Sequence, residues 1–158
     1  MITLALDLGI HTGYALLDNE TGQVQKVGQW HLGRNLVKVM RSSVPAYRLW
    51  KRLTDLEPRV PLDAIIFEGT FRHGTAGYHL TSMETVSILF AMTRSLKWMR
   101  VNPSAWKKAV VGHGRAPASD YVACAKQHWP GVEVRTEDIA AALCLLSYWQ
   151  QANALAAG

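Results

Sequence analysis

The sequence predicts a single α/β domain spanning residues 1–158, with a five-stranded mixed sheet flanked by α-helices. Two observations support this prediction. Three strand-like stretches open the chain, and helical stretches then alternate with short apolar runs. An antiparallel meander followed by strand–helix–strand crossovers gives three antiparallel strands and then two parallel ones. A chain of 158 residues is long enough to bury a core of its own.

The five strands are predicted at residues 2–8, 12–17, 24–32, 62–68 and 98–101. The first is almost continuously apolar, as expected of a strand that is buried on both faces. Residues 18–22 (DNETG) carry a hairpin signal, which joins the second strand to the third. This order of strands has the outline of the RNase H-like fold, although the outline alone does not identify it.

Helices are predicted at residues 46–56, 83–96, 104–111 and 122–129, and from Thr136 onward. Pro58 and Pro61 end the first helix, and Thr136 is a favourable N-cap for the last. The buried face of the second helix is predicted to hold Met83, Val86, Leu89 and Phe90. The alanine-rich tail, residues 152–158, is expected to fray.

The composition is that of a folded protein, with 49% hydrophobic and 18% charged residues. The 17 basic and 12 acidic residues give a formal charge of +5, which favours polyanion partners but is also common among proteins that bind no DNA. No apolar run is long enough to span a membrane and no signal peptide opens the chain, so we expect a cytoplasmic protein. Cys124 and Cys144 lie in apolar helical patterns and are expected to be reduced. The six histidines lack zinc-site spacing.

Two carboxylates interrupt the apolar strands. Asp7 lies within the first strand, and Glu68 ends the fourth, directly after Ile65, Ile66 and Phe67. Burying a carboxylate is costly unless it is paired, hydrogen-bonded or bound to a metal. Either residue alone could meet an arginine or cap a loop. Together, at the ends of two core strands, they favour a functional site.

Glu137 and Asp138 add acidic groups at the start of the last helix, where the helix dipole alone would account for them. If that helix begins beside Asp7, three or four carboxylates converge and require divalent cations, with Mg²⁺ or Mn²⁺ preferred to zinc. Two such ions, roughly 3.5–4 Å apart, activate water and stabilise the leaving oxygen in phosphodiester hydrolysis.

Four segments in series resemble the RuvC-like Holliday junction resolvases of the RNase H-like superfamily, in their phage or prophage form. They are residues 7–15 (DLGIHTGYA), 65–68 (IIFE), 101–116 (VNPSAWKKAVVGHGRA) and 137–143 (EDIAAAL). They occur in the family's order and span most of the chain. The resemblance implies a metal-dependent endodeoxyribonuclease that resolves four-way DNA junctions in the cytoplasm of a bacterium or an infected host.

The resemblance also implies roles for individual residues. Asp7, Glu68 and Asp138 become catalytic, metal-binding carboxylates, and Glu137 becomes an auxiliary ligand. Lys107 or Lys108 would contact the scissile phosphate. Without the surrounding motif, these lysines would indicate only a solvated helix face.

DNA contacts are implied at five basic residues: Arg72, His73, Lys107, Lys108 and Arg115. The first two lie in a glycine-rich loop, residues 69–78, which follows Glu68 and could instead be a surface turn. Family members act as two-fold dimers. Ile88 and Met92 point away from the predicted buried face of their helix and could form a homodimer interface.

The sequence departs from the family pattern at two places. Ala141 stands where a second acidic residue is usual, so that Glu137 substitutes for it or the site has three carboxylates. Residues 116–119 (APAS) lack a lysine that many relatives carry. A junction-binding protein with a weakened site is therefore one alternative, and another RNase H-like nuclease, of the YqgF type or acting on other DNA, is a second. Actin-like ATPases share the first motif, but they need two domains and are excluded by length.

Overall fold

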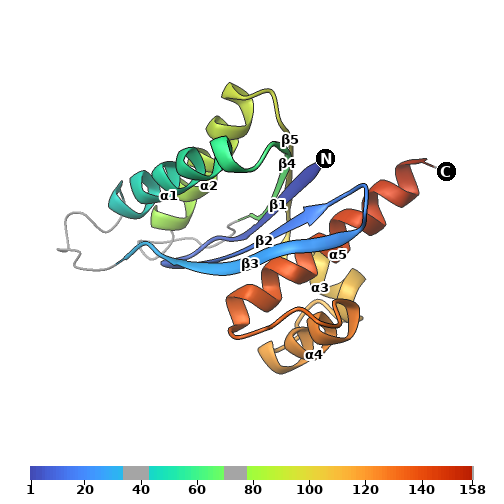
Figure 1. Cartoon of the computed structure of the whole chain (residues 1–158). Coiled ribbons are helices and arrows are strands. Elements are labelled where there is room, and N and C mark those ends of the chain that lie inside the picture. Colours follow the sequence, from blue (N-terminus) through green and yellow to red (C-terminus); the bar gives the residue numbers. More distant parts are fainter. Residues whose placement is uncertain (34–42, 70–77, 158) are drawn as a thin grey trace.

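The computed structural model describes residues 1–33, 43–69 and 78–157 and contains the predicted mixed sheet (Figure 1). The strands are β1 (Ile2–Asp7), β2 (His11–Asp18), β3 (Gln23–His31), β4 (Leu62–Glu68) and β5 (Lys97–Val101). Their order across the sheet is β3-β2-β1-β4-β5. β1 pairs antiparallel with β2 and β2 with β3, whereas β4 is parallel to both β1 and β5. The predicted fold class is confirmed.

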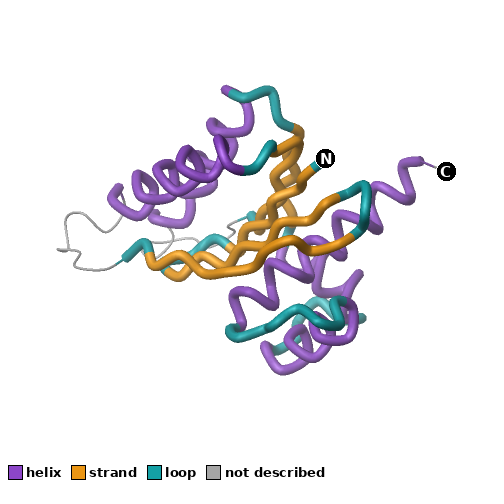
Figure 2. The backbone as a smooth tube through the Cα atoms, in the orientation of Figure 1, coloured by secondary structure: helices purple, strands orange, loops and turns teal. Residues whose placement is uncertain are grey.

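Helices cover both faces of the sheet (Figure 2). One face carries α1 (Ser43–Leu56), which continues into the 3₁₀ helix η2 (Glu57–Arg59), and α2 (Tyr78–Thr93). The other face carries α3 (Pro103–Val111), α4 (Ala118–His128) and α5 (Glu137–Ala157). Each layer buries its own apolar core against the sheet. In β1, Leu4 and Leu6 face α1 and α2, and Ala5 faces α5; all three are fully buried.

Side-chain caps mark the start of α3 and of α5, and the cap of α5 is the one predicted from the sequence. Asn102 caps α3, because its side chain accepts a hydrogen bond of 2.9 Å from the Ser104 N–H. Thr136 caps α5 in the same way, with its hydroxyl oxygen 3.2 Å from the Ile139 nitrogen. α5 runs on to Ala157, so helical backbone reaches into the tail that we expected to fray, consistent with the high helix propensity of alanine.

The predicted face of α2 was partly wrong. Met83 and Phe90 are fully buried, but Leu89 is 49% exposed and Ile88 packs against the core instead. Met92 is exposed, as predicted. The cysteines are free thiols, as expected. Among the described helices, none is long and apolar enough to cross a membrane.

Candidate active site

The strand register places the predicted strand carboxylates side by side. β1 and β4 are parallel, with Leu6 opposite Phe67, so the next residues, Asp7 and Glu68, are neighbours at the carboxyl ends of their strands. Side chains alternate along a strand. Asp7 therefore faces the same side as Ala5, toward α5 and its core. Both carboxylates project from the sheet face that α3, α4 and α5 cover.

α5 delivers a third carboxylate to the same place. Gly13 pairs with Asp7 across β1 and β2. A Cβ atom on Gly13 would lie 2.0 Å from the Asp138 carbonyl oxygen, so only glycine permits this approach of the helix. Gln29 on β3 pairs with Gly13, and its side-chain amide donates a hydrogen bond to Asp138 Oδ2. The sheet and α5 therefore bring Asp7, Glu68 and Asp138 together.

The electrostatics of Asp7 reflect this convergence. The pKa of Asp7 is raised well above its ordinary value, first because protein surrounds the group and then because Glu68 and Asp138 lie nearby. Lys107 acts in the opposite direction and lowers the pKa of Asp7. The predicted lysine is thus within electrostatic reach of the acidic cluster.

Two aromatic residues that we had assigned no role complete the surroundings of Lys107. The indole N–H of Trp106 donates a hydrogen bond of 2.7 Å to Glu68 Oε2. The Lys107 ammonium lies 5.4 Å from the centre of the Trp106 ring and 5.5 Å from that of Tyr121, at cation–π distances. Burial raises the pKa of Tyr121 to about 12, with smaller contributions from Glu137, Asp7, Asp138 and Glu68. The phenol therefore stays protonated at neutral pH.

Sequence reasoning missed Gln29, Trp106 and Tyr121 for a common reason. They carry no charge, and their contribution depends on strand register and helix packing. Trp106 stood within a segment used for the resemblance, but no role was given to it. One signal for Gln29 was available. It lies two residues after Val27 on β3, so its side chain faces the same side of the sheet as Val27, toward α5.

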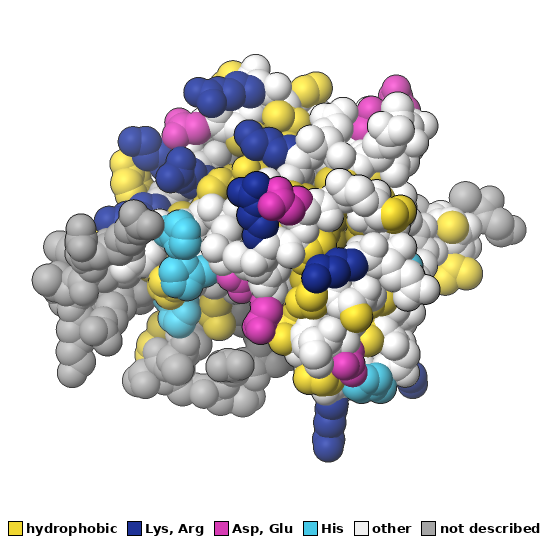
Figure 3. All heavy atoms as spheres, turned by 60° about the horizontal axis from the view of Figure 1, so that its bottom comes forward, with side chains coloured by type: hydrophobic (Ala, Val, Ile, Leu, Met, Phe, Trp, Pro, Cys, Tyr) yellow, Lys and Arg dark blue, Asp and Glu magenta, His cyan; other side chains and the backbone are white. Residues whose placement is uncertain are grey.

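Three of the remaining predicted residues are described by the structure, and all three are exposed. Glu137 is exposed at the first turn of α5. Lys108 and Arg115 are exposed on α3 and on the turn after it. Arg72 and His73 fall outside the described residues. On the face drawn in Figure 3, acidic side chains (magenta), histidines (cyan) and basic side chains (dark blue) lie close to one another.

Ala141, the first departure from the family pattern, lies one turn beyond Asp138. It is 4% exposed and packs in the apolar core beneath α5. Ala141 therefore adds a methyl group to the core, and the described cluster around Asp7 has three carboxylates.

The donor set suits a hard divalent cation in its chemistry, because Asp7, Glu68 and Asp138 offer only carboxylate oxygens around a crowded negative site. The ligand geometry is not assembled: within residues 1–33, 43–69 and 78–157, no three His, Cys, Asp or Glu side chains stand close enough to hold one ion.

No family model matches the chain, and no curated protein matches its sequence. Solved structures do match. Thermus thermophilus RuvC has a TM-score of 0.73 at 15% identity, with 97% of each chain covered. RuvC from the same organism, in complex with Holliday junction substrate, gives 0.75 at 16% identity, with 97% of this chain and 96% of that chain covered. Fowlpox virus resolvase, solved with substrate Holliday junction DNA, gives 0.62 at 16% identity, over 94% and 99%.

These matches define the class of fold. The chain has an RNase H-like fold, with the five-stranded mixed sheet and flanking helices that it shares with RuvC. At this sequence identity, the likeness concerns the fold alone.

Proposed function

We propose that this chain is a metal-dependent endodeoxyribonuclease that resolves four-way DNA junctions with paired, symmetric nicks, in a bacterial or infected-cell cytoplasm. The observation that carries the proposal is the meeting of Asp7, Glu68 and Asp138 at one end of the sheet, beside Lys107. The solved proteins that share this fold over nearly the whole chain include a RuvC and a viral resolvase, each in complex with Holliday junction DNA.

Asp7, Glu68 and Asp138 would hold the cations, two Mg²⁺ or Mn²⁺ ions in our proposal, with Glu137 as an auxiliary ligand. When bound, such ions activate the attacking water and stabilise the leaving 3′-oxygen. The Lys107 ammonium, held against two aromatic rings, offers a fixed positive charge to the scissile phosphate. The neutral phenol of Tyr121 is available as a hydrogen-bond donor beside the carboxylates.

Exposed basic residues would bind the DNA backbone. Lys108 and Arg115 are exposed and lie near Lys107 in the sequence. Arg72 and His73 are the other proposed DNA contacts. Paired nicks call for two active sites, so we propose a homodimer. Leu89 and Met92 of α2 are 49% and 62% exposed and would form its interface.

A second candidate is a junction-binding protein whose site is weakened. It is favoured by Ala141, a buried methyl group one turn beyond Asp138. Such a protein would bind a four-way junction without cutting it.

The test is incubation of the purified protein with a labelled four-way junction, a linear duplex and an RNA–DNA hybrid, in Mg²⁺ and then in Mn²⁺. Asp7→Asn is the inactive control. We expect cleavage of the junction alone, and none by the variant. Tight binding without cleavage would favour the second candidate, and cleavage of the hybrid or duplex instead would refute the resolvase proposal while leaving a nuclease.

A further inference from the structure

We propose that Gln29 and Trp106 are positioning residues, whose uncharged N–H groups hold the carboxylates of Asp138 and Glu68 on either side of Asp7. The proposal rests on the function proposed above and adds to it. It identifies the groups that orient two of the three acidic side chains, and it locates them on β3 and α3, outside the motif positions for metal ligands.

Gln29 lies at a position fixed by the sheet. It pairs with Gly13, and Gly13 pairs with Asp7, so the three residues form one row across β3, β2 and β1. The Gln29 amide reaches from this row to Asp138 Oδ2 at the start of α5. One carboxylate oxygen of Asp138 is thus held by the sheet, and the bond leaves the negative charge of the group intact.

Trp106 holds one carboxylate oxygen of Glu68 in the same way. Its side chain is 1% exposed, and a buried indole N–H requires an acceptor. The acceptor is Glu68 Oε2, at 2.7 Å. The same ring lies 5.4 Å from the Lys107 ammonium and meets the Tyr121 ring edge-on, with centroids 5.7 Å apart. Trp106 therefore fixes an acidic and a basic group of the site at once.

Neutral donors suit this task for an electrostatic reason. An arginine or lysine bound to Asp138 or Glu68 would cancel the charge that attracts a divalent cation. An amide or indole N–H orients the carboxylate and leaves its charge available. Partners of this kind fix the direction of metal ligands, and their loss typically weakens metal binding about 10- to 100-fold.

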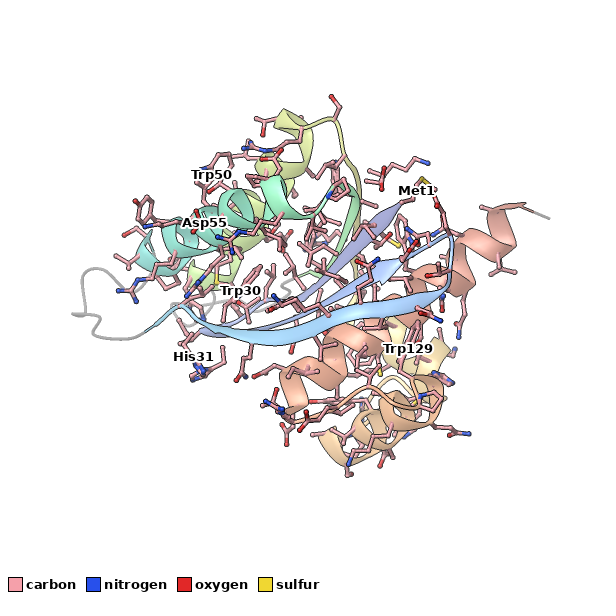
Figure 4. All side chains as sticks on the ribbon, in the orientation of Figure 1. Met1, Trp30, His31, Trp50, Asp55 and Trp129 are labelled. Atoms are coloured by element: carbon pink, nitrogen blue, oxygen red, sulfur yellow. The ribbon has the colours of Figure 1, made fainter. Side chains whose placement is uncertain are left out.

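The chain supplies matched controls for both residues. Trp129 is also buried, at 8% exposure, but its N–H donates to Leu143 and Ser147 within the core. Figure 4 shows it on the same side of the sheet, among the helices. Gln25 on β3 donates to Asp18 Oδ2, at the opposite end of the strand from Gln29. Each control removes a like donor that serves no residue of the acidic cluster.

The experiment measures Mn²⁺ binding to the full chain without DNA, by electron paramagnetic resonance of the free ion, for the wild type, Gln29→Leu, Trp106→Phe, Gln25→Leu and Trp129→Phe. We expect Gln29→Leu and Trp106→Phe to bind Mn²⁺ at least about 10-fold more weakly than the wild type. Gln25→Leu and Trp129→Phe should bind as the wild type does. Melting curves in a chelator report the cost of each substitution to folding separately.

The outcomes separate this proposal from the one on which it rests. A wild type that binds no Mn²⁺ contradicts the metal-dependent function, and the positioning role with it. A wild type that binds Mn²⁺, with Gln29→Leu and Trp106→Phe binding equally well or more tightly, overturns the positioning role alone. If Trp106→Phe does not fold, Gln29→Leu decides, because Gln29 lies outside the buried core.

Discussion

At Gly13 the sheet and α5 approach closely, and replacing this glycine with alanine is expected to disturb both the fold and the acidic cluster. The added methyl group would lie 2.0 Å from the Asp138 carbonyl oxygen and 2.2 Å from its carbonyl carbon. Ordinary contact begins near 3.4 Å, so the start of α5 must move away by about 1.4 Å. Both obstructing atoms belong to the backbone, and no change of rotamer relieves the clash.

Overpacking of this kind costs about 1–3 kcal/mol, and 1 kcal/mol lowers the Tm of a domain of this size by about 2–4 °C. We therefore expect Gly13→Ala to lower the Tm by about 2–12 °C in a chelator. Because the shift carries Asp138 away from Asp7, the rise in Tm on adding Mn²⁺ should also shrink or vanish.

Gly28→Ala is the matched control for this prediction. Its methyl group would meet the Tyr14 ring, at 2.6–2.7 Å, rather than a backbone group. Tyr14 belongs to the core on the α1 and α2 side, away from the carboxylates. This variant should lose stability but keep the Mn²⁺ response. A Gly13→Ala protein with the Tm and Mn²⁺ response of the wild type would refute the contact between Gly13 and α5.

Three further predictions concern single side chains. The pKa of Asp7 is raised in the folded state, so the stability that this group contributes is complete below its unfolded pKa of 3.8 and is lost as pH rises through the folded pKa. In a chelator at neutral pH, Asp7→Asn should therefore raise the Tm by about 1–8 °C. An unchanged or lower Tm across a pH series would contradict the crowding of charge at Asp7. Lys107→Met should slow junction cleavage about 100-fold in single-turnover assays and leave Mn²⁺ binding near that of the wild type, whereas an unaltered rate would remove Lys107 from the reaction. Met92→Glu should convert a dimer to a monomer in analytical ultracentrifugation, since Met92 is 62% exposed and a charge there costs a folded monomer little; a dimer that persists would place the interface elsewhere.

The fold followed from the sequence where apolar patterns were unambiguous. The apolar runs in β1 and β4 predicted buried strands, and most residues of both strands are buried. The face of α2 could not be determined in the same way. Its apolar residues surround most of the helix, so the position of Leu89 relative to Ile88 depends on the tilt of α2 over the sheet.

Some residues of the candidate site could be predicted from the sequence, and others could not. Asp7 and Glu68 were predicted because a carboxylate in an apolar strand is costly. The neighbouring acids Glu137 and Asp138 could not be ranked from sequence, because both suit the first turn of a helix. The close approach of Asp138 to Gly13 distinguishes them. Gln29 and Trp106 were not predicted, because strand pairing and helix packing give uncharged donors their partners.

The most direct test of the central claim is to map the nicks on a four-way junction labelled on each strand in turn, in Mg²⁺ and in Mn²⁺, with the wild type and Asp7→Asn. We predict metal-dependent nicks at symmetric positions on two opposing strands, absent from the Asp7→Asn reaction. Junction DNA left intact by a wild-type protein that binds it, or nicks that persist in Asp7→Asn, would contradict the assignment of this acidic cluster as the active site of a resolvase.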